Sequence, residues 1–299
     1  MKQKQQSNEQ PFVFEVVVLR DNQSYSVELN RPKTGKYKVD YYATSDDPNC
    51  IFMEKRFHGD FECFFQKAGT YRIALHGSFP GLLFRDMVYR DYPKIGRELM
   101  QACKTYEEIL SEDEGYYVYY LSKIISWGTN VWQKMDYMFC CEFLNIQAVD
   151  APDLSHVNIL DGMFSGCDTF NSPIEHWNVS NITSMWQMFG FCAHFNQPLN
   201  RWNVSNVTEM GQMFLFACSF NQPLNGWNVS RVKDMVEMFK FAKAFNQSLD
   251  SWNVSSIDTE AGGGDLGTPN MDEEIVVING KIVRRPLILL PSWQVLQRS

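Results

Sequence analysis

Residue types that commonly carry out catalysis or bind metals are few in this sequence, and their spacing fits neither task. The 299 residues contain eight Cys and five His, and the motifs C-x-x-C, H-E-x-x-H, G-x-S-x-G and the Walker loop are absent. The Cys are scattered through apolar stretches, which does not suggest a disulfide framework. We therefore expect no enzymatic activity, no metal and no cofactor. The five His are His58, His76, His156, His176 and His194.

Side chains suited to binding recur at a fixed spacing instead. The tetrapeptide Trp-Asn-Val-Ser occurs four times, 25 residues apart, and each copy carries one Asn. The positions beside it vary from copy to copy between His, Arg, Asn, Gly and Ser. Variable polar positions next to an invariant pattern are where a partner would be recognised. The candidate partner-binding residues are Asn178, Asn203, Asn228, Asn253, His176, Arg201, Arg231, Asn181 and Asn206.

These side chains belong to an internal repeat. The Met-Phe pairs and the Phe-Asn pairs keep the same 25-residue step as the Trp residues, and the pattern extends back to Trp127 through a degenerate copy at 152–155. The repeat array therefore covers 127–257 in about five units. A fixed step of this kind is the signature of a solenoid, in which each unit packs only on its neighbours.

The pattern inside one unit predicts a strand and a short helical turn. Alternation places Trp202 and Val204 on one face and Asn203 and Ser205 on the other, as in a half-buried strand. Met210, Met213 and Phe214 then follow at a spacing that suits one helical turn. One unit cannot bury enough apolar surface to offset the entropy of ordering its backbone. We therefore expect a leucine-rich-repeat-like solenoid that depends on capped ends.

Comparison of the copies separates two further columns of the array. Asn171, Asn196, Asn221 and Asn246 follow the repeated Phe and are expected to form a ladder that satisfies turn backbone. Cys167 and Cys192 exchange with Ala at 217 and 242, which predicts a small buried filler rather than a disulfide or a metal ligand.

The motif F-N-Q-P-L-N-x-W-N-V-S-N-V-T-x-M-x-x-M-F resembles the 25-residue repeat of the BspA-like leucine-rich-repeat surface proteins of bacteria. The resemblance covers about 120–257. It implies a non-enzymatic surface protein used for adhesion or partner binding, and it transfers no ligand-contact residue. It also implies a protein partner, from a host, a matrix or a neighbouring cell surface, and a location at the cell surface or outside the cell. The chain shows no signal peptide, so a cytoplasmic location is the alternative.

The region before the array divides into three parts. Residues 1–11 are expected to be a disordered N-terminus, and 12–86 a β-sandwich whose strands include 12–20, 25–30, 37–42, 61–66 and 70–77. The stretch Ala68–Tyr71 resembles the end of a PKD-type, immunoglobulin-like domain. Residues 87–126 are expected to be a helical connector that caps the array, with a helix over 92–111.

The region after the array divides into two parts. Residues 258–274 are acidic and rich in Gly, which predicts a flexible linker. Residues 275–299 are expected to be a hairpin arm, because Asn279-Gly280 fits a type I′ turn between apolar runs. This arm either caps the last unit or pairs with another chain, since an isolated hairpin is marginal in water.

Together these features predict a mainly β chain with short helices, in which a β-sandwich-like domain precedes a solenoid of about five 25-residue coils. The net charge of −8 disfavours a nucleic-acid partner, and no stretch is apolar enough to span a membrane. The expected function is binding of a protein or cell-surface partner. The alternative is a structural protein that self-associates through its C-terminal hairpin.

Overall fold

The structure is a computed structural model that describes residues 9–33, 38–52, 56–85, 119–270 and 273–286. Its described residues are mainly β, with thirteen strands in three sheets and no helix. The short helices expected in the array are therefore not found in this part of the chain. The helix expected over 92–111 lies outside the described residues.

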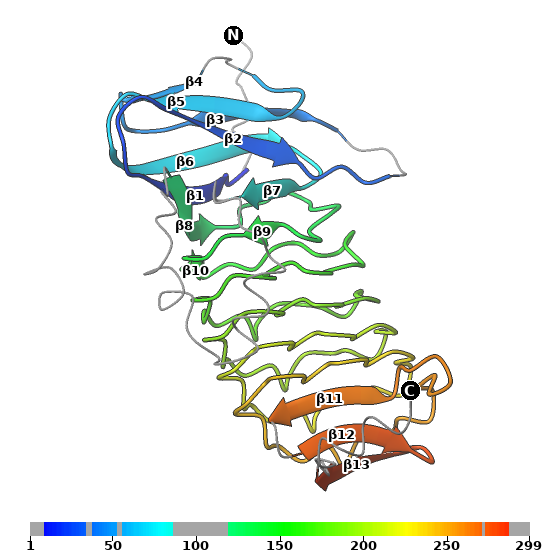
Figure 1. Ribbon diagram of the computed structural model, residues 1–299. Coiled ribbons are helices and arrows are strands. Elements are labelled where there is room, and N and C mark those ends of the chain that lie inside the picture. The colour runs from blue at the N-terminus through cyan, green and yellow to red at the C-terminus, as the bar shows by residue number, and fades with distance from the viewer. Residues whose placement is uncertain (1–8, 34–37, 53–55, 86–118, 271–272, 287–299) are drawn as a thin grey trace, which may run out of the picture.

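Two five-stranded sheets pack against each other at the N-terminal end (Figure 1). Ring contacts between Phe14 and Phe84 and between Phe65 and Tyr71 join the two layers. The first sheet has the order β10-β8-β1-β6-β3, with bounds β10 Asn145–Ile146, β8 Tyr119–Ser126, β1 Phe12–Val18, β6 Gly69–Ser78 and β3 Asp40–Thr44. The second has the order β4-β5-β2-β7-β9, with bounds β4 Cys50–Phe52, β5 Phe61–Phe65, β2 Gln23–Leu29, β7 Leu82–Arg85 and β9 Phe139–Cys140.

Alternation of apolar and polar residues explains these strands. In β1 the side chains of Phe12, Phe14, Val16 and Val18 are buried and those between them are half-buried, which is the period of a strand with one face on the core. The strands expected over 12–20, 25–30, 61–66 and 70–77 correspond to β1, β2, β5 and β6. Residues 40–42 of the expected strand 37–42 fall in β3, and residue 37 lies outside the described part.

The two sheets continue directly into the repeat array. β8 falls within the segment expected to be a helical connector, yet it pairs antiparallel with β1, where Leu121 lies opposite Val16. Its buried Leu121 and Ile124 pack in the same core as β1, which favours a strand over a helix. β9 and β10 belong to the first repeat unit, and they pair in parallel with β7 and β8.

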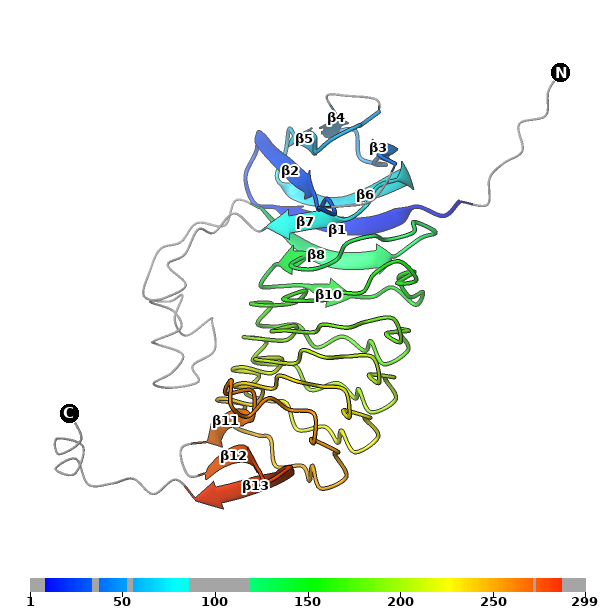
Figure 2. The same cartoon turned by 90° about the vertical axis from the view of Figure 1, so that its right-hand side faces the viewer.

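Successive repeat units stack in sequence order below the sheets (Figure 2). The backbone alternates between two kinds of hydrogen bond along the Met-Phe segment. Phe189 donates its N–H to the Met213 carbonyl of the next unit (2.9 Å), whereas Met188 donates back to the Met185 carbonyl of its own unit (3.2 Å). Isolated parallel bridges join 159, 184, 209 and 234 in the same manner.

Left-handed residues explain why this segment is neither helix nor strand. Two residues in most units have positive φ, which interrupts an α-helix of L-residues and also the extended conformation of a strand. The chain therefore forms consecutive tight turns that still place alternate N–H groups toward the next unit. The two columns are Tyr137, Gly162, Gln187, Gln212 and Glu237, and then Gly166, Phe191, Phe216 and Phe241.

The Trp-Asn-Val-Ser segments have the predicted burial but not the predicted strand. Trp202 and Val204 are buried, and Asn203 is exposed. The side chain of Asn203 accepts a hydrogen bond from the N–H of Ser205 (3.2 Å), which closes a turn on the side chain itself. This local bond takes the place of a strand-to-strand bond.

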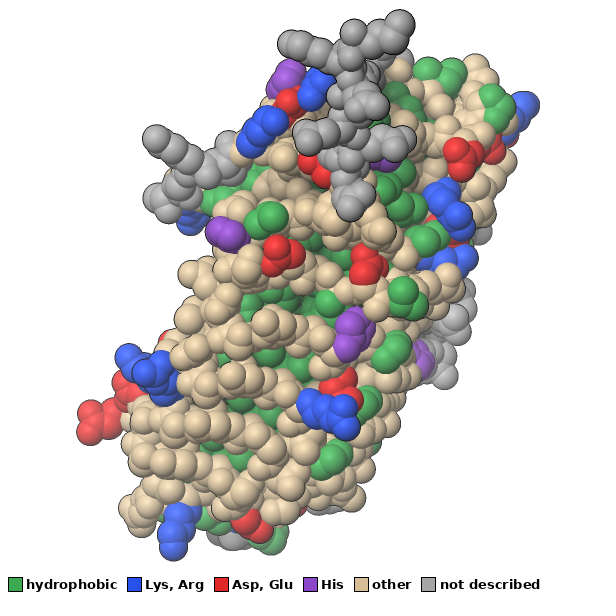
Figure 3. Space-filling model, turned by 180° about the vertical axis from the view of Figure 1, so that it is seen from behind, with side chains coloured by type: hydrophobic (Ala, Val, Ile, Leu, Met, Phe, Trp, Pro, Cys, Tyr) green, Lys and Arg blue, Asp and Glu red, His purple; other side chains and the backbone are tan. Residues whose placement is uncertain are grey.

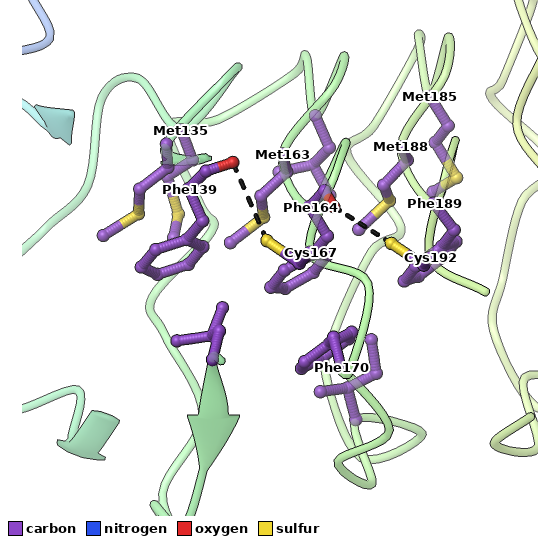
Figure 4. Packing of buried hydrophobic residues seen from close by; sticks show 14 of the residues in the cluster. Met135, Phe139, Met163, Phe164, Cys167, Phe170, Met185, Met188, Phe189 and Cys192 are labelled. Atoms are coloured by element: carbon purple, nitrogen blue, oxygen red, sulfur yellow. Dashed lines mark hydrogen bonds between the residues drawn. The ribbon is translucent and has the colours of Figure 1, made fainter. Parts of the chain in front are cut away.

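Stacks of Phe rings fill the interior of the array. Phe139, Phe164 and Phe189 lie in a row with one ring from each unit, and their ring centroids are 5.6 and 5.7 Å apart (Figure 4). The stack begins at Phe84 in β7 of the second sheet, 5.7 Å from Phe139, and continues to Phe239. Rings that are nearly parallel at this centroid distance are offset from one another, which is a favourable arrangement for aromatic pairs.

Two predicted columns are confirmed, the Asn ladder and the small buried filler. The N–H of Asn196 is donated to Asn171 Oδ1 (2.9 Å), and Asn221 and Asn246 repeat this bond one unit further on. The small column is fully buried at Cys167, Cys192, Ala217 and Ala242. All described Cys are free, and the Cys192 thiol donates to the Phe164 carbonyl at 3.0 Å (Figure 4).

A three-stranded sheet closes the end of the array. Its order is β11-β12-β13, with bounds β11 Asp265–Asn270, β12 Glu273–Ile278 and β13 Lys281–Pro286. β11 lies within the segment expected to be a flexible linker. It is a strand because its backbone continues the ladder of the array, where Phe239 donates to the Leu266 carbonyl (2.9 Å) and Leu266 is fully buried.

The expected hairpin is present and lies on the last unit. Asn279 and Gly280 both have positive φ, 52° and 70°, as a type I′ turn requires. Arg284 reaches from β13 over the ring of Phe245 (5.6 Å), and its Nη2 donates to the Gln247 carbonyl (2.8 Å). The hairpin therefore caps the array, as the first of the two sequence interpretations states.

Candidate partner-binding site

The first candidate column contains the four Asn residues of the repeated tetrapeptide. Each is exposed, and each holds the N–H of the Ser two residues later at 3.2 Å. The side-chain oxygen of each Asn thus accepts a hydrogen bond within the turn, while its NH2 group takes no part in this bond. The residues are Asn178, Asn203, Asn228 and Asn253.

The second candidate column forms bonds between units. Asn181 Nδ2 donates to the Ser155 carbonyl (3.1 Å), and Asn206 Nδ2 donates to the Ser180 carbonyl (2.8 Å). Arg231 continues the column and donates from Nη1 to Asn206 Oδ1 (2.9 Å). These exposed bonds fix the side chains in a row, so that their outer atoms have defined positions.

The remaining candidates, His176 and Arg201, precede the Trp of two neighbouring units. Both are exposed, and Arg201 Nε lies 4.0 Å from Glu175 Oε1. A contact this long and this exposed is worth little in stability, so the guanidinium remains available to a ligand. All nine candidate residues are therefore exposed, and the stacking of units brings them together along one edge of the array.

The array presents a mainly uncharged surface on the side seen in Figure 3, where charged side chains are few and scattered. Amide and hydroxyl groups of this kind can donate and accept hydrogen bonds without a strong field. The arrangement suits recognition of a partner over an extended surface. Among the described residues, no three His, Cys, Asp or Glu side chains gather as a metal site requires.

Sequence reasoning missed a pair of surface aromatic residues on the left-handed segment. Tyr137 is 49% exposed, and Trp186 is half-buried two units further on. Tyr137 lies against Gly162, and Trp186 lies against Gly211, in each case a glycine of the next unit. The signal in the sequence is that these two glycines replace the larger residues found at the same repeat positions in other units, such as Gln187 and Val236.

Carboxylates flank these aromatic residues. Burial raises the pKa of Asp161 above its ordinary 3.8, although hydrogen bonds from Ser184 Oγ and the Trp186 N–H oppose this. Burial also raises the pKa of Glu209, and the charge of Asp234 adds to the effect.

Comparison with known proteins assigns a similarity to the array alone. A family model described as "Mycoplasma protein of unknown function, DUF285" matches residues 117–181 and 133–252. These ranges contain β8 and the repeat units up to the last Trp, and they leave the N-terminal strands β1–β7 outside. The chain matches no curated protein and no solved structure. No helix in the described ranges is long and apolar enough to cross a membrane.

Proposed function

We propose that 127–257 form a leucine-rich-repeat-like solenoid of the BspA-like type, which binds a protein or a cell-surface partner without catalysis. The observation that carries the proposal is the exposed row of nine candidate side chains held at fixed positions by the stacking of units. The 25-residue step of the backbone bonds supports the solenoid assignment. In this proposal the two N-terminal sheets form a PKD-like sandwich that supports the solenoid.

The chemistry of the row suits binding better than catalysis. Its groups are amides, one imidazole and two guanidinium groups, and most are already engaged in turns or bonds between units. Such groups position a partner through many modest contacts. The two Arg residues are the best candidates for strong contacts, because Arg is enriched among residues that dominate binding energy.

The binding proposal is tested with purified full-length chain on immobilised matrix proteins and on intact host cells. The test variant changes His176, Arg201 and Arg231 to Ala together, and the matched control changes the exposed Lys243 and Lys281 to Ala. We expect the test variant to bind at least about tenfold more weakly, a loss of about 1.4 kcal/mol. Equal binding by both variants would contradict the proposed site.

Surface display by bacteria is the location that this function requires. Protease treatment of intact producing cells, with a cytosolic protein as control, is expected to remove the array while the control stays intact. Digestion of the array only after lysis would instead support the cytoplasmic alternative, and the adhesion proposal would be abandoned.

A second function, self-association through the C-terminal hairpin, has one observation in its favour. β13 pairs with β12 on one side, and no described strand pairs with its other edge. An open strand edge can accept a further strand. Sedimentation of the full chain over a hundredfold range of concentration tests this alternative, and a constant monomer mass would exclude it.

A further inference from the structure

Tyr137 and Trp186 occupy adjacent columns on the outer surface of the left-handed segments. Tyr137 has a φ of 51°, a left-handed conformation that it shares with Gly162, Gln187, Gln212 and Glu237 in the same column of the repeat. Tyr137 is the one aromatic side chain among the exposed large apolar residues described between 119 and 286, the others being Val131, Val149, Ile159 and Ile278. The left-handed backbone is thus a property of the repeat, and the observation that points to binding is the exposure of the Tyr137 ring.

Two glycines make this display possible. A Cβ atom at Gly162 would lie 2.4 Å from Tyr137 Cε1, so no other residue fits without moving the ring. A Cβ atom at Gly211 would lie 3.1 Å from Trp186 Cδ1 and 3.2 Å from Val236 Cγ1. The sequence thus departs from its own repeat at the two positions where a ring from the preceding unit leans across.

Hydrogen-bonding groups lie near the two rings. Asp161 Oδ1 accepts from Ser184 Oγ and from the Trp186 N–H (2.9 Å), and Oδ2 has no hydrogen bond within the described residues. The side-chain amide of Gln187, beside Trp186, likewise has no bond within those residues. A carboxylate oxygen is thus available in the unit between the two aromatic side chains, and an amide in the unit of Trp186, where the Gln187 side chain lies against Gly190.

We infer that Tyr137, Asp161, Gln187 and Trp186 form a binding site for a neutral oligosaccharide. Aromatic rings pack against the C–H faces of sugar rings, while carboxylate and amide groups bond to sugar hydroxyls. Stacked chain segments lie about 4.8 Å apart, so two units separate the rings by about 10 Å, the length of a disaccharide in an extended chain. The two rings therefore contact sugars two positions apart.

The carboxylates around the site favour binding of a neutral sugar over an anionic one. The three carboxylates Asp161, Glu209 and Asp234 outnumber Lys233, the cation whose charge acts on Glu209, so this surface has a net negative charge and disfavours sulfated or uronic chains. The site uses other columns than the proposed partner-binding row. It is therefore a further activity, and its failure would leave the proposed function standing.

The experiment measures binding of β-1,4-linked tetrasaccharides of glucose and of N-acetylglucosamine to the full chain by calorimetry. We expect at least one to bind with a Kd below about 1 mM. Tyr137→Ala and Trp186→Ala are each expected to weaken binding at least about tenfold. Val236→Ala, two units along the column of Trp186, is the matched control and is expected to bind as the parent does.

Further variants separate recognition from folding. Trp186→Leu keeps an apolar side chain over Gly211 but removes the ring, and the same loss is expected with an unchanged melting temperature. Tyr137→Phe keeps the ring and is expected to retain binding. The inference is overturned if neither tetrasaccharide binds at about 10 mM, if the Tyr137→Ala/Trp186→Ala double variant binds normally, or if a sulfated tetrasaccharide or tetralysine binds more tightly than both.

Discussion

Single side chains fix the start of the repeat array. One oxygen of Asp150, Oδ2, accepts hydrogen bonds from Ser126 Oγ (3.0 Å), Trp127 N–H (2.9 Å) and Gly128 N–H (2.9 Å). Gly128 has a φ of 65°, and a Cβ atom there would meet the backbone carbonyl of Gln10 at 2.5 Å. The turn from β8 into the first unit therefore depends on one carboxylate and one glycine.

Replacing Asp150 tests this dependence. Asp150→Ala leaves the Trp127 N–H without its acceptor and leaves the Gly128 N–H with Ser126 Oγ alone (3.1 Å), and we expect a loss of about 1–3 kcal/mol in the free energy of unfolding. Asp153→Ala is the control, since the Asp153 carboxylate is exposed and, within the described part of the chain, accepts hydrogen bonds only from the neighbouring Ser155, including its N–H (2.9 Å). Urea denaturation measures both. A loss at Asp150 no larger than at Asp153 would contradict the assigned role.

The raised pKa of Asp161 predicts a pH dependence of stability. Because the folded-state pKa lies above the ordinary 3.8, the folded state favours the protonated carboxyl, and this contribution is lost as pH rises through 3.8 and then through the raised pKa. Asp161→Asn cannot titrate, so its stability relative to the parent should increase over that window.

Urea unfolding of both proteins at several pH values from 3.8 to 7 measures the difference. The increase cannot exceed about 1.4 kcal/mol per pH unit for one proton. Asp46→Asn changes an exposed carboxyl and serves as the control. A difference between Asp161→Asn and the parent that stays constant with pH would show that Asp161 does not titrate differently in the folded state.

At the scale of elements, the C-terminal hairpin closes a core that would otherwise end in water. Arg284 covers the ring of Phe245 and pairs with Glu273 (Nη1 to Oε1, 2.8 Å), while both partners remain about one-quarter exposed. Its neighbour Arg285 pairs with Glu274 (2.6 Å) on the more exposed face of the hairpin. The two Arg residues thus differ in packing rather than in charge.

This difference predicts unequal effects of substitution. Arg284→Ala loses a ring contact and a bond to the Gln247 carbonyl, and we expect a cost of about 1–2 kcal/mol. Arg285→Ala removes an exposed ion pair and should cost less than about 1 kcal/mol. Thermal denaturation of the two variants compares them directly. A larger loss for Arg285→Ala would contradict the cap.

The sequence predicted burial better than it predicted secondary structure. The buried columns of Trp202, Val204 and Cys192 follow from periodicity, which reports which side chains face the core. The local conformation depended on side-chain-to-backbone bonds, as at Asn203, and on left-handed residues such as Gln187, which have no periodic signal. The helices and strands expected inside the units were wrong for that reason.

Other errors came from contacts between distant parts of the chain. The strand β8 depends on pairing with β1, and β11 depends on the Met-Phe segment of the last unit. The acidic, Gly-rich composition that predicts a linker says nothing of such pairing. The exposed candidate row could be predicted because it follows the repeat, whereas the position of Tyr137 over Gly162 required the fold.

At the scale of the whole molecule, the N-terminal sheets and the array share one hydrophobic core. A single cluster of buried residues extends from Phe12 through Phe84 and Phe139 to the hairpin residue Val277. The parallel pairs β7–β9 and β8–β10 also join the two parts by backbone bonds. If the two parts were separated, each would therefore expose apolar side chains that are buried in the intact chain.

This shared core predicts that the two parts unfold together. All eight Trp lie at 127 or later, so Trp fluorescence reports only the later part of the chain. Hydrogen exchange of a peptide containing β5 (Phe61–Phe65) reports the sheets. We expect coincident transitions in urea, and we expect the excised fragment 127–257 to be unfolded. A folded fragment or two separate transitions would contradict the prediction.

The equal spacing of the stacked Phe rings has a consequence for how the number of repeat units can change in the gene. Because each unit offers its successor the same ring at 5.7 Å, an in-frame duplication or loss of 25 codons within the array places every new ring at a contact the fold already uses. Such a change would lengthen or shorten the molecule by about 4.8 Å per unit while both ends stay intact. Replication slippage in the gene could thus adjust the reach of this protein in discrete steps, without any new packing having to evolve.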